Sequence, residues 1–427
     1  MSEEVFLSDE FLRQLISVGD VDLIVGVPSF NDAATIPRVV QAVEEGVLRS
    51  YRRERVALVN VDGGSRDGTP EALLEASLLA KRDGRVVELL RTLRWITATS
   101  GNNGAPGSTL RAILAAADLL HAKACAVISA SSENATAAWT EALLSPIYRE
   151  RWDFVAPLYS RHKYDGLLTR NVLYPLTRAV FHRGMRELRA SEFAFSGNLA
   201  SHCLAQEDWH NDAVQGGAEM WMAMQAMANS YRCCQTFLGA KPRATGGAGV
   251  VNLIRSTLGG FFRCLEVTES VWLADPAPEQ QELQTIGPDH QLTSEAVRID
   301  RKKLVEMFKS GTRELAEMLN VILDADTHAE LMRLAAAGES EFRLGNALWA
   351  RIVYECAAAY HHSVMNREHL VQAMIPIYRG RVCSFLAQHR SSNADAMEAD
   401  LEDLCREFTN QRAFFVERWK KKREGAS

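Results

Sequence analysis

Residues 23–32, Leu-Ile-Val-Gly-Val-Pro-Ser-Phe-Asn-Asp, form an apolar stretch that runs directly into a polar turn, and a helix-like segment follows. The same order recurs in residues 56–70, where Val-Ala-Leu-Val-Asn-Val precedes Asp-Gly-Gly-Ser-Arg-Asp-Gly-Thr-Pro. A repeated strand, turn and helix predicts a mainly parallel α/β sheet. Because the carboxyl ends of parallel strands lie at one edge of a sheet, we expect both turns there, where open α/β folds bind ligands.

The second turn contains groups that are suited to holding a nucleoside and its phosphates. Asp62 and Asp67 supply carboxylates, Ser65 supplies a hydroxyl, and the glycines expose backbone N–H groups. We therefore predict a nucleotide site at this edge of the sheet. The alternative interpretation is a simple turn followed by a capped helix.

The whole chain has the composition of an ordinary globular protein. Its 427 residues predict two domains, and its formal net charge of −6 argues against a nucleic-acid-binding surface, which is normally basic. The sequence contains no apolar run as long as a transmembrane helix, and the N-terminus lacks the features of a signal peptide, so we expect a cytoplasmic protein. The eight cysteines form no C-x-x-C pair, which predicts buried free thiols.

Strand and helix signals alternate through the first part of the chain. We predict further strands at residues 85–90, 124–129 and 154–158, and a polar turn at residues 187–196. Such alternation is typical of a sheet that is covered by helices on both faces.

The later part of the chain has helical periodicity and no strand signal. Asp275-Pro276-Ala277-Pro278 marks a joint, and from residue 294 onward apolar residues recur at helical spacing. We therefore predict an α/β domain over residues 1–275 and a helical C-terminal domain over residues 276–427.

The order of these motifs resembles the nucleotide-sugar glycosyltransferases of the family-2-like group, most closely the glucosyl-3-phosphoglycerate, glucosylglycerate and mannosylglycerate synthases. Residues 28–32 are similar to the first turn of that group, and residues 62–69 match its Asp-Ser/Gly-Gly-Ser-x-Asp-Gly-Thr turn nearly residue for residue. The resemblance implies a GT-A type nucleotide-binding sheet, mostly parallel and Rossmann-like, followed by an all-helical C-terminal extension. It also implies donor-nucleotide contacts from Pro28, Ser29, Asp32, Asp62, Gly63, Gly64 and Ser65.

The sequence departs from this family where the synthases bind a divalent metal. Their Asp-x-Asp motif corresponds to a degenerate motif with Ser129 and Ser131, although Thr136 and Trp139 keep the register. Their last ligand, a histidine, corresponds to Arg243. Hydroxyls are poor ligands for Mg²⁺ or Mn²⁺. A divalent cation is the family norm, but we expect no cofactor and no metal-binding residue here.

Motifs further along the chain supply the remaining candidate residues. Glu219 corresponds to the carboxylate beside the reacting sugar, or it stabilises the first turn of a helix. Glu192 binds acceptor hydroxyls, or it is an exposed turn residue. Arg161, with His162 and Lys163, receives an anionic acceptor, or it belongs to a solvated charge run.

Two interpretations of the missing metal ligands remain. In the first, Arg243 takes over the charge of the ion with Lys241 nearby, because a guanidinium binds phosphate oxygens in a fixed fork. The alternative for Arg243 itself is a solvated loop arginine. In the second interpretation, the chain keeps the fold but has lost turnover.

The preferred hypothesis is a hexosyltransferase, retaining by resemblance, that acts without a metal at the degenerate motif. It would move a hexose from a UDP- or GDP-linked sugar to a small hydroxylated, glycerate-like acid. Glu219 and Arg243 would be catalytic, and Glu192 and Arg161 would bind the acceptor. The alternative is a catalytically silent protein of the same fold that binds nucleotide sugar or acts as a scaffold. We expect no nucleic-acid partner, and a homodimer through the helical region is a further expectation.

Overall fold

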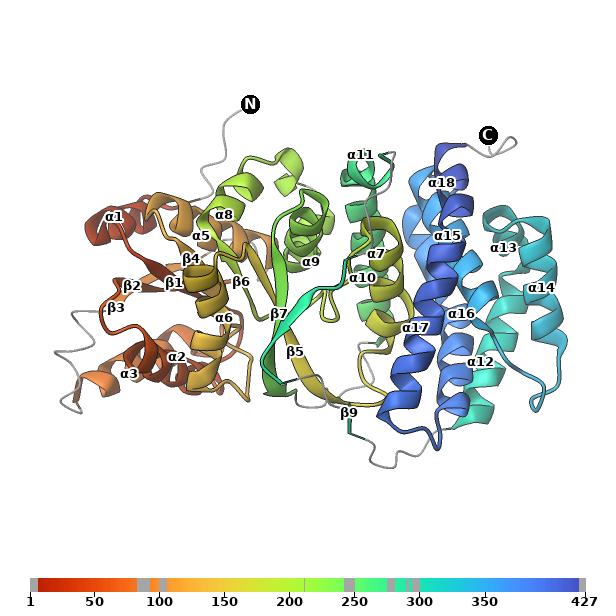
Figure 1. Ribbon diagram of the computed structural model, residues 1–427, viewed down its shortest axis with the longest axis horizontal. Helices are drawn as coiled ribbons and strands as arrows, with labels where there is room; N and C mark the ends of the chain where they lie inside the picture. The colour runs from red at the N-terminus through yellow and green to blue at the C-terminus, as the bar shows by residue number, and fades with distance from the viewer. Residues whose placement is uncertain are drawn as a thin grey trace. The chain divides into compact units, whose positions relative to one another are not determined.

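The computed structural model describes residues 7–82, 93–99, 106–210, 212–241, 250–274, 281–288, 292–293 and 300–421 (Figure 1). Contacts divide the chain into two compact units. The sheet unit comprises Met1–Tyr159, Glu187–Pro242 and Leu283–His290, and the helical unit comprises Ser160–Arg186, Arg243–Glu282 and Gln291–Ser427. The domain boundary predicted at residue 275 stays a prediction, and contacts assign the segments next to it on both sides to the helical unit.

The core of the sheet unit is a mixed sheet with the strand order β3-β2-β1-β4-β6-β5-β7-β8. Strands β1 to β4 run parallel, β6 is antiparallel to β4 and β5, and β7 is parallel to β8. The strands are β1 (Leu23–Ser29), β2 (Val56–Asp62), β3 (Leu93–Thr99), β4 (Ala124–Val127), β5 (Phe154–His162), β6 (Phe193–Ser196), β7 (Cys233–Ala240) and β8 (Gln284–Ile286).

Helices cover both faces of this sheet, and for that reason its central strands are buried and mostly apolar. Every residue of β2 is buried, as expected of a strand without a solvent face. Figure 1 shows α2, α3 and α6 on one face and α1, α5 and α8 on the other, and α9 also packs on α5. The helices are α1 (Asp9–Val18), α2 (Ile36–Ser50), α3 (Thr69–Arg82), α5 (Pro106–Leu119), α6 (Ala137–Glu150), α8 (Gly197–Leu204) and α9 (Asp212–Ala228).

A glycine on β1 sets how closely α5 approaches the sheet. A Cβ atom at Gly26 would lie 2.7 Å from Cγ2 of Ile113 on α5, which is closer than real Cβ contacts come. Glycine at this position therefore lets α5 pack directly on the strand that leads into the first polar turn.

The predicted fold class, a mostly parallel α/β sheet followed by a helical region, is confirmed. The predicted strands at 124–129 and 154–158 correspond to β4 and β5, whereas the one at 85–90 lies outside the described residues. The predicted turn at 187–196 is wrong at its end, because β6 occupies Phe193–Ser196. Those four residues are too few to give a period-2 signal, and their pairing with β4 and β5 makes the strand.

The helical unit consists of helices that pack through small residues and aromatic rings. On α12 and α16, a Cβ at Gly380 would lie 2.5 Å from Cδ2 of Phe308, so glycine permits the close crossing. Strand β9 (Leu292–Thr293) pairs with Arg161 and His162 at the end of β5. The helices are α7 (Tyr174–Phe181), α10 (Val250–Val267), α11 (Glu269–Trp272), α12 (Arg301–Glu314), α13 (Ala316–Ile322), α14 (Ala325–Ala336), α15 (Asn346–His361), α16 (Arg367–Gln388), α17 (Ala394–Asn410) and α18 (Arg412–Lys420).

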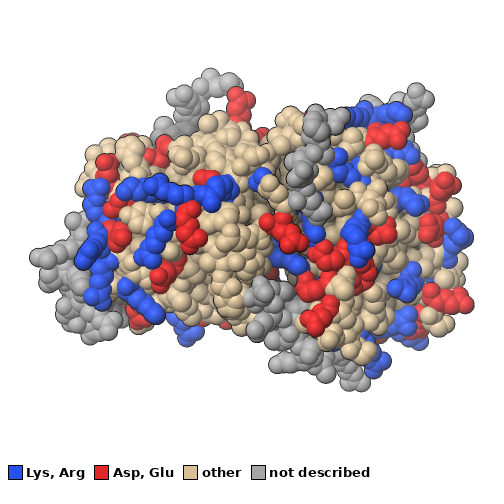
Figure 2. All heavy atoms as spheres, viewed as in Figure 1, with Lys and Arg blue, Asp and Glu red and all other residues tan. Residues whose placement is uncertain are grey.

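Three predictions about the whole chain can be compared with the structure. All eight cysteines are free and buried, which confirms the prediction of buried thiols. Within the described part of the chain, the helices are too short or too polar to cross a membrane. Figure 2 shows basic and acidic side chains interspersed on the face in view, in keeping with the small net charge of −6.

Candidate functional site

A cavity of about 360 Å³ opens in the sheet unit at the carboxyl ends of β1 and β4. Its walls come from the first polar turn, the start of α5, the segment after β4, the segment before β6, and α9. Six of the residues predicted from the sequence line it, namely Pro28, Ser29, Asp32, Ser129, Ser131 and Glu219. Residues from five separate parts of the sequence therefore meet where the strand–turn pattern predicts a ligand site.

The second polar turn is held by the carboxylate of Asp62, which is 3% exposed. Its Oδ1 accepts hydrogen bonds from the backbone N–H groups of Gly64 (2.9 Å) and Ser65 (2.8 Å). Its Oδ2 accepts from the hydroxyls of Ser65 (2.6 Å) and Ser29 (2.9 Å). Gly64 has a φ of 89°, which favours glycine. Asp62 thus fixes the shape of the turn, and its contact with a nucleoside, like those of Gly63, Gly64 and Ser65, stays a prediction.

The two polar turns are bonded to each other, as the parallel pairing of β1 and β2 requires. The backbone N–H of Asp32 donates to Oγ1 of Thr69 (2.8 Å), and that of Asn31 donates to Oγ of Ser65 (2.8 Å). The carboxylate of Asp32 accepts from the N–H of Phe30 (2.9 Å). Burial raises the pKa of Asp32 and outweighs that hydrogen bond, and the nearby carboxylates raise it further. The prediction that the two turns lie side by side is confirmed.

Two serine side chains after β4 line the cavity. Ser129 and Ser131 follow β4, and their Oγ atoms lie 2.8 Å apart, within hydrogen-bond distance. The backbone N–H of Ala130 donates to the carbonyl of Pro28 (3.0 Å), which holds this segment beside the first turn. The two serines therefore occupy the wall of the site, with hydroxyls that bond to each other.

Glu219 faces a cation across the cavity. The backbone of α9 is non-helical at Gly217, so Glu219 lies in the first turn of the helix that restarts there. Its Oε1 is 3.8 Å from Nε of Arg189, and both side chains line the cavity. Burial raises the pKa of Glu219, although Arg189 acts in the opposite direction. Glu219 thus lies at a helix start and also lines the cavity, and its role beside a reacting sugar stays a prediction.

Arg189 is the functional candidate that the sequence interpretation missed. It precedes Ser191 and Glu192 in a polar turn, where one more basic residue does not stand out from a solvated surface. Its position became evident only when the fold brought this turn beside α9. Thr109 at the start of α5 is a second polar residue of the cavity wall that the sequence patterns did not identify.

Glu192 is buried in a network of donors. It is 4% exposed, and its Oε2 accepts from the hydroxyl of Tyr159 (2.5 Å) and from Nζ of Lys241 (3.4 Å). The hydroxyl of Ser132 donates to its Oε1. The alternative of an exposed turn residue is therefore wrong. Acceptor binding by Glu192 stays a prediction, because in this structure the carboxylate is bonded within the protein.

The basic cluster at residues 161–163 belongs to the helical unit and is not a solvated charge run. His162 and Lys163 are buried, and Nζ of Lys163 donates to the carbonyls of His389 (3.1 Å) and Arg390 (3.2 Å) after α16. That alternative is therefore wrong for these two residues. The acceptor role of Arg161 stays a prediction.

The remaining predicted site residue, Arg243, lies in residues 242–249, outside the described residues. Among the side chains that the structure does describe, no group of three or more His, Cys, Asp or Glu residues could hold a metal ion. The hydroxyls of Ser129 and Ser131 do not fit a divalent cation either, because a neutral hydroxyl is a weak ligand for it.

Comparisons with known proteins give a faint structural likeness only. No protein-family model and no curated protein matches the chain. Among solved structures it is similar to glucosyl-3-phosphoglycerate synthase from Mycobacterium tuberculosis. One such structure is a complex with Mn²⁺, UDP and phosphoglyceric acid, 16% identical, covering 59% of this chain and 82% of that chain with a TM-score of 0.40. Another structure of that synthase, with Mg²⁺ and UDP, is 16% identical to this chain. The match covers 61% of this chain and 83% of that chain, with a TM-score of 0.42.

These complexes correct one expectation. The prediction that the site needs no cofactor is wrong by this comparison, because the similar structures were solved with Mn²⁺ or Mg²⁺. At such low identity and TM-score, the likeness decides neither the family nor the activity of this chain.

Proposed function

We propose that the chain is a hexosyltransferase that moves a hexose from a nucleotide-diphosphate sugar to a small hydroxylated acid, with a glycerate-like acid as the first candidate. The observation that carries this proposal is the cavity at the carboxyl edge of β1 and β4, where Asp32, Glu219 and Arg189 meet. A carboxylate pair and a guanidinium suit a ligand with many hydroxyls and a negative charge.

The reaction needs one bond exchange. An oxygen of an acceptor hydroxyl forms a bond to the anomeric carbon of the hexose, the bond from that carbon to the diphosphate oxygen breaks, and the hydroxyl proton passes to the leaving diphosphate. Glu219 would lie near the anomeric carbon or the acceptor, where a carboxylate stabilises developing positive charge. Arg189 would attract the anionic part of a substrate, and Arg161 and Arg243 remain further candidate cations for the acceptor and the diphosphate.

The nucleoside would bind at the two turns. Asp32 retains acceptor capacity beside the cavity, and the turn that Asp62 fixes lies next to it at the same edge of the sheet. Pro28 and Ser29 complete this wall. UDP- and GDP-linked sugars are the donors to test. A cytoplasmic location, and a homodimer through the helical region, belong to the same proposal.

A specific observation favours one rival. The hydroxyls of Ser129 and Ser131 bond to each other at the positions of the family's acidic motif, and this arrangement lacks the charge that would bind a cation on the diphosphate. A protein that binds nucleotide sugar without turning it over, and acts as a scaffold, would have the same cavity.

Binding and turnover are measured separately to distinguish these two functions. Calorimetry with UDP-glucose and GDP-mannose, in buffer that contains Mn²⁺ or Mg²⁺, tests binding. Mass spectrometry of reactions with glycerate and 3-phosphoglycerate then tests transfer. We expect binding of one donor and a glycosylated acid as product. Binding without product supports the scaffold, and no binding of any donor refutes both functions.

The role of Glu219 has its own test. Glu219→Gln keeps the shape of the side chain but removes its charge, so we expect transfer to slow by about 10²-fold or more while donor binding is retained. Glu75→Gln, an exposed position on α3, is the matched control and should leave the rate unchanged. Transfer by Glu219→Gln at the unaltered rate would contradict the proposed role.

A further inference from the structure

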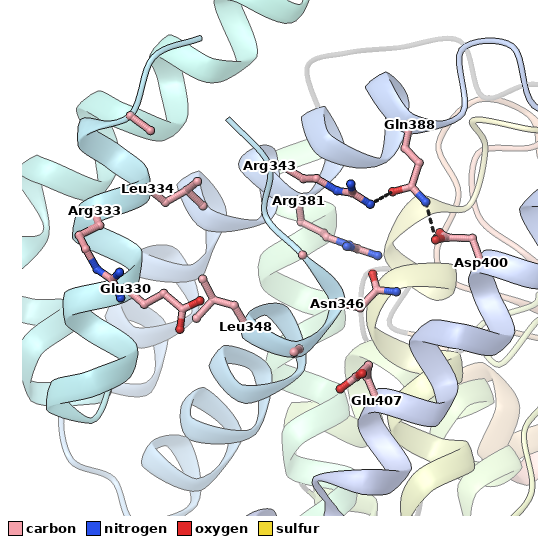
Figure 3. Close-up of a pocket in the computed structure, with 13 residues that line it drawn as sticks. Glu330, Arg333, Leu334, Arg343, Asn346, Leu348, Arg381, Gln388, Asp400 and Glu407 are labelled. Carbon is pink, nitrogen blue, oxygen red and sulfur yellow. Dashed lines mark hydrogen bonds between the residues drawn. The ribbon is translucent and has the colours of Figure 1, made fainter. Parts of the chain in front are cut away.

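A second and larger cavity, of about 610 Å³, lies within the helical unit. It is formed by α14, α15, α16 and α17 together with the segment that precedes α15 (Figure 3). Its volume falls in the range of small-molecule sites, roughly 300–1,000 Å³. The proposed hexosyl transfer uses no residue of this cavity.

The start of α15 opens into this cavity with unused backbone donors. Gly345 is the N-cap residue and has no side chain to cap the helix. The first hydrogen bond of the helical ladder is the one that the backbone N–H of Trp349 donates to the carbonyl of Gly345 (3.1 Å). In the described part of the chain no acceptor bonds to the N–H groups of Asn346, Ala347 and Leu348. Three free N–H groups at the positive end of a 16-residue helix favour an anion.

A buried arginine points to the same ligand independently. Arg381 is 3% exposed and lines the cavity. Its Nε donates to Oδ1 of Asn171 (2.8 Å) and its Nη1 donates to the carbonyl of Leu344 (3.1 Å), so the plane of the guanidinium is fixed. No other residue that the structure describes bonds to its Nη2. Burial lowers its pKa to about 10, so the group is still a cation at neutral pH.

Among the described residues, no carboxylate of the same wall hydrogen-bonds to Arg381, although the nearby charge of Asp400 partly offsets the effect of burial on its pKa. Asp400 accepts from His389 (3.0 Å) and from Gln388 (2.6 Å). Glu330 lies 3.7 Å from Arg351. A buried cation that lacks a bonded carboxylate is costly unless a ligand supplies the negative charge.

Other polar groups of the wall would complete the site. Arg343 reaches Gln388 only at 3.5 Å, and Figure 3 shows its side chain beside that of Arg381. The side chains of Asn346 and Glu407 lie on the other side of Arg381 in the same view. Amide and carboxylate oxygens of this kind accept hydrogen bonds from hydroxyl groups.

We propose that this cavity binds a small phosphorylated, hydroxyl-bearing metabolite, with its phosphate held by the first turn of α15 and by Arg381. Arg343 adds a second guanidinium, and the cavity is large enough to hold the hydroxylated remainder of the molecule. This site lies in the helical unit, so its test is independent of transfer at the sheet.

The test is calorimetry on the full chain at constant ionic strength and pH 7.5, with glucose 6-phosphate, inorganic phosphate and glucose as probes. We expect glucose 6-phosphate to bind about tenfold more tightly than inorganic phosphate, because its hydroxyls add contacts, and glucose to show no binding. Absence of glucose 6-phosphate binding by the wild-type chain would overturn the proposal.

The deciding variant is Gly345→Asp. A Cβ at Gly345 meets open space, and an N-cap aspartate would bond to the amides of the first turn and repel an anion while it stabilises the helix. We expect it to weaken glucose 6-phosphate binding by about tenfold or more and to unfold at no lower temperature than wild type. Binding of unchanged strength in this variant would refute the site.

Two further variants control for charge and for location. Ser340→Asp adds the same charge at an exposed position before α15 and should change affinity by less than about threefold. Glu219→Gln alters the cavity of the sheet unit and should leave glucose 6-phosphate binding unchanged. Loss of binding in Glu219→Gln would place the probe in the sheet unit and overturn the inference.

Discussion

Glu44 is a buried carboxyl group on α2 that has no hydrogen-bond partner, and replacing it with glutamine should stabilise the protein. The side chain is 7% exposed, and no residue in the described ranges donates to it. The buried carboxylates of Glu192 and Glu355, by contrast, accept bonds from two or more donors. Burial raises the pKa of Glu44 from its ordinary value of 4.5 to about 7, and the charge of Glu45 adds to this effect.

The size of the effect follows from that shift. Below pH 4.5 both the folded and the unfolded chain hold the proton, so the group costs nothing. As the pH rises toward 7 the unfolded chain releases the proton first, and the free energy of unfolding falls. Above pH 7 the loss in free energy of unfolding is constant. It amounts to ~3 kcal/mol, because the pKa rises from 4.5 to about 7 and each pKa unit corresponds to about 1.36 kcal/mol. Glutamine has no charge to bury, so Glu44→Gln should recover most of this energy.

Urea unfolding of wild type and Glu44→Gln at pH 5 and pH 8 measures the difference. We expect a gain of less than about 1 kcal/mol at pH 5 and of about 2–3 kcal/mol at pH 8. Glu75→Gln removes an exposed carboxylate from α3 and should change stability by less than about 0.5 kcal/mol at both values. A Glu44→Gln gain that is the same at pH 5 and pH 8, or that is absent at pH 8, would refute the reasoning.

Two further changes test the packing and the turn. Gly380→Ala places a Cβ against Phe308 and should lower the free energy of unfolding, measured with urea, by about 1–3 kcal/mol. The control Gly259→Ala has open space around its Cβ and should raise the free energy of unfolding slightly. Equal effects of the two variants would contradict the close crossing of α12 and α16. Asp62→Asn replaces one carboxylate oxygen by an amide N–H₂ group that faces other donors. We expect the free energy of unfolding in urea to fall by about 2 kcal/mol. An unaltered free energy of unfolding would show that the turn does not depend on the carboxylate.

The strand–turn pattern predicted the part of the site that local sequence determines. Ser29 and Asp62 end adjacent parallel strands, so their register brings them together once the strands pair. Ser129 and Ser131 were instead identified by their resemblance to an Asp-x-Asp motif, and the structure places them in the wall shortly after β4. Residues at the ends of strands could be placed in this way because parallel pairing itself defines the edge of the sheet.

The rest of the site depends on contacts that the sequence does not encode locally. Arg189 faces Glu219 only because the antiparallel strand β6 and the kinked helix α9 bring two distant segments together. Glu192 is buried although it lies in a polar turn, since Tyr159 and Lys241 close over it from β5 and from the end of β7. The periodicity of a short segment does not report such long-range partners.

Two buried carboxylates beside the candidate site differ in how their charge is compensated, and this difference separates their roles. Glu192 accepts from the hydroxyl of Tyr159 and from the ammonium group of Lys241, so donors within the protein already occupy its oxygens. Among the described residues, the cation near Glu219 is Arg189 at 3.8 Å, and burial raises the pKa of Glu219. A carboxylate with few donors gains most from a ligand that brings positive charge or a hydroxyl to it. Substrate binding would therefore change the environment of Glu219 more than that of Glu192, which makes Glu219 the group more suited to act on a substrate and Glu192 the group more suited to hold the wall.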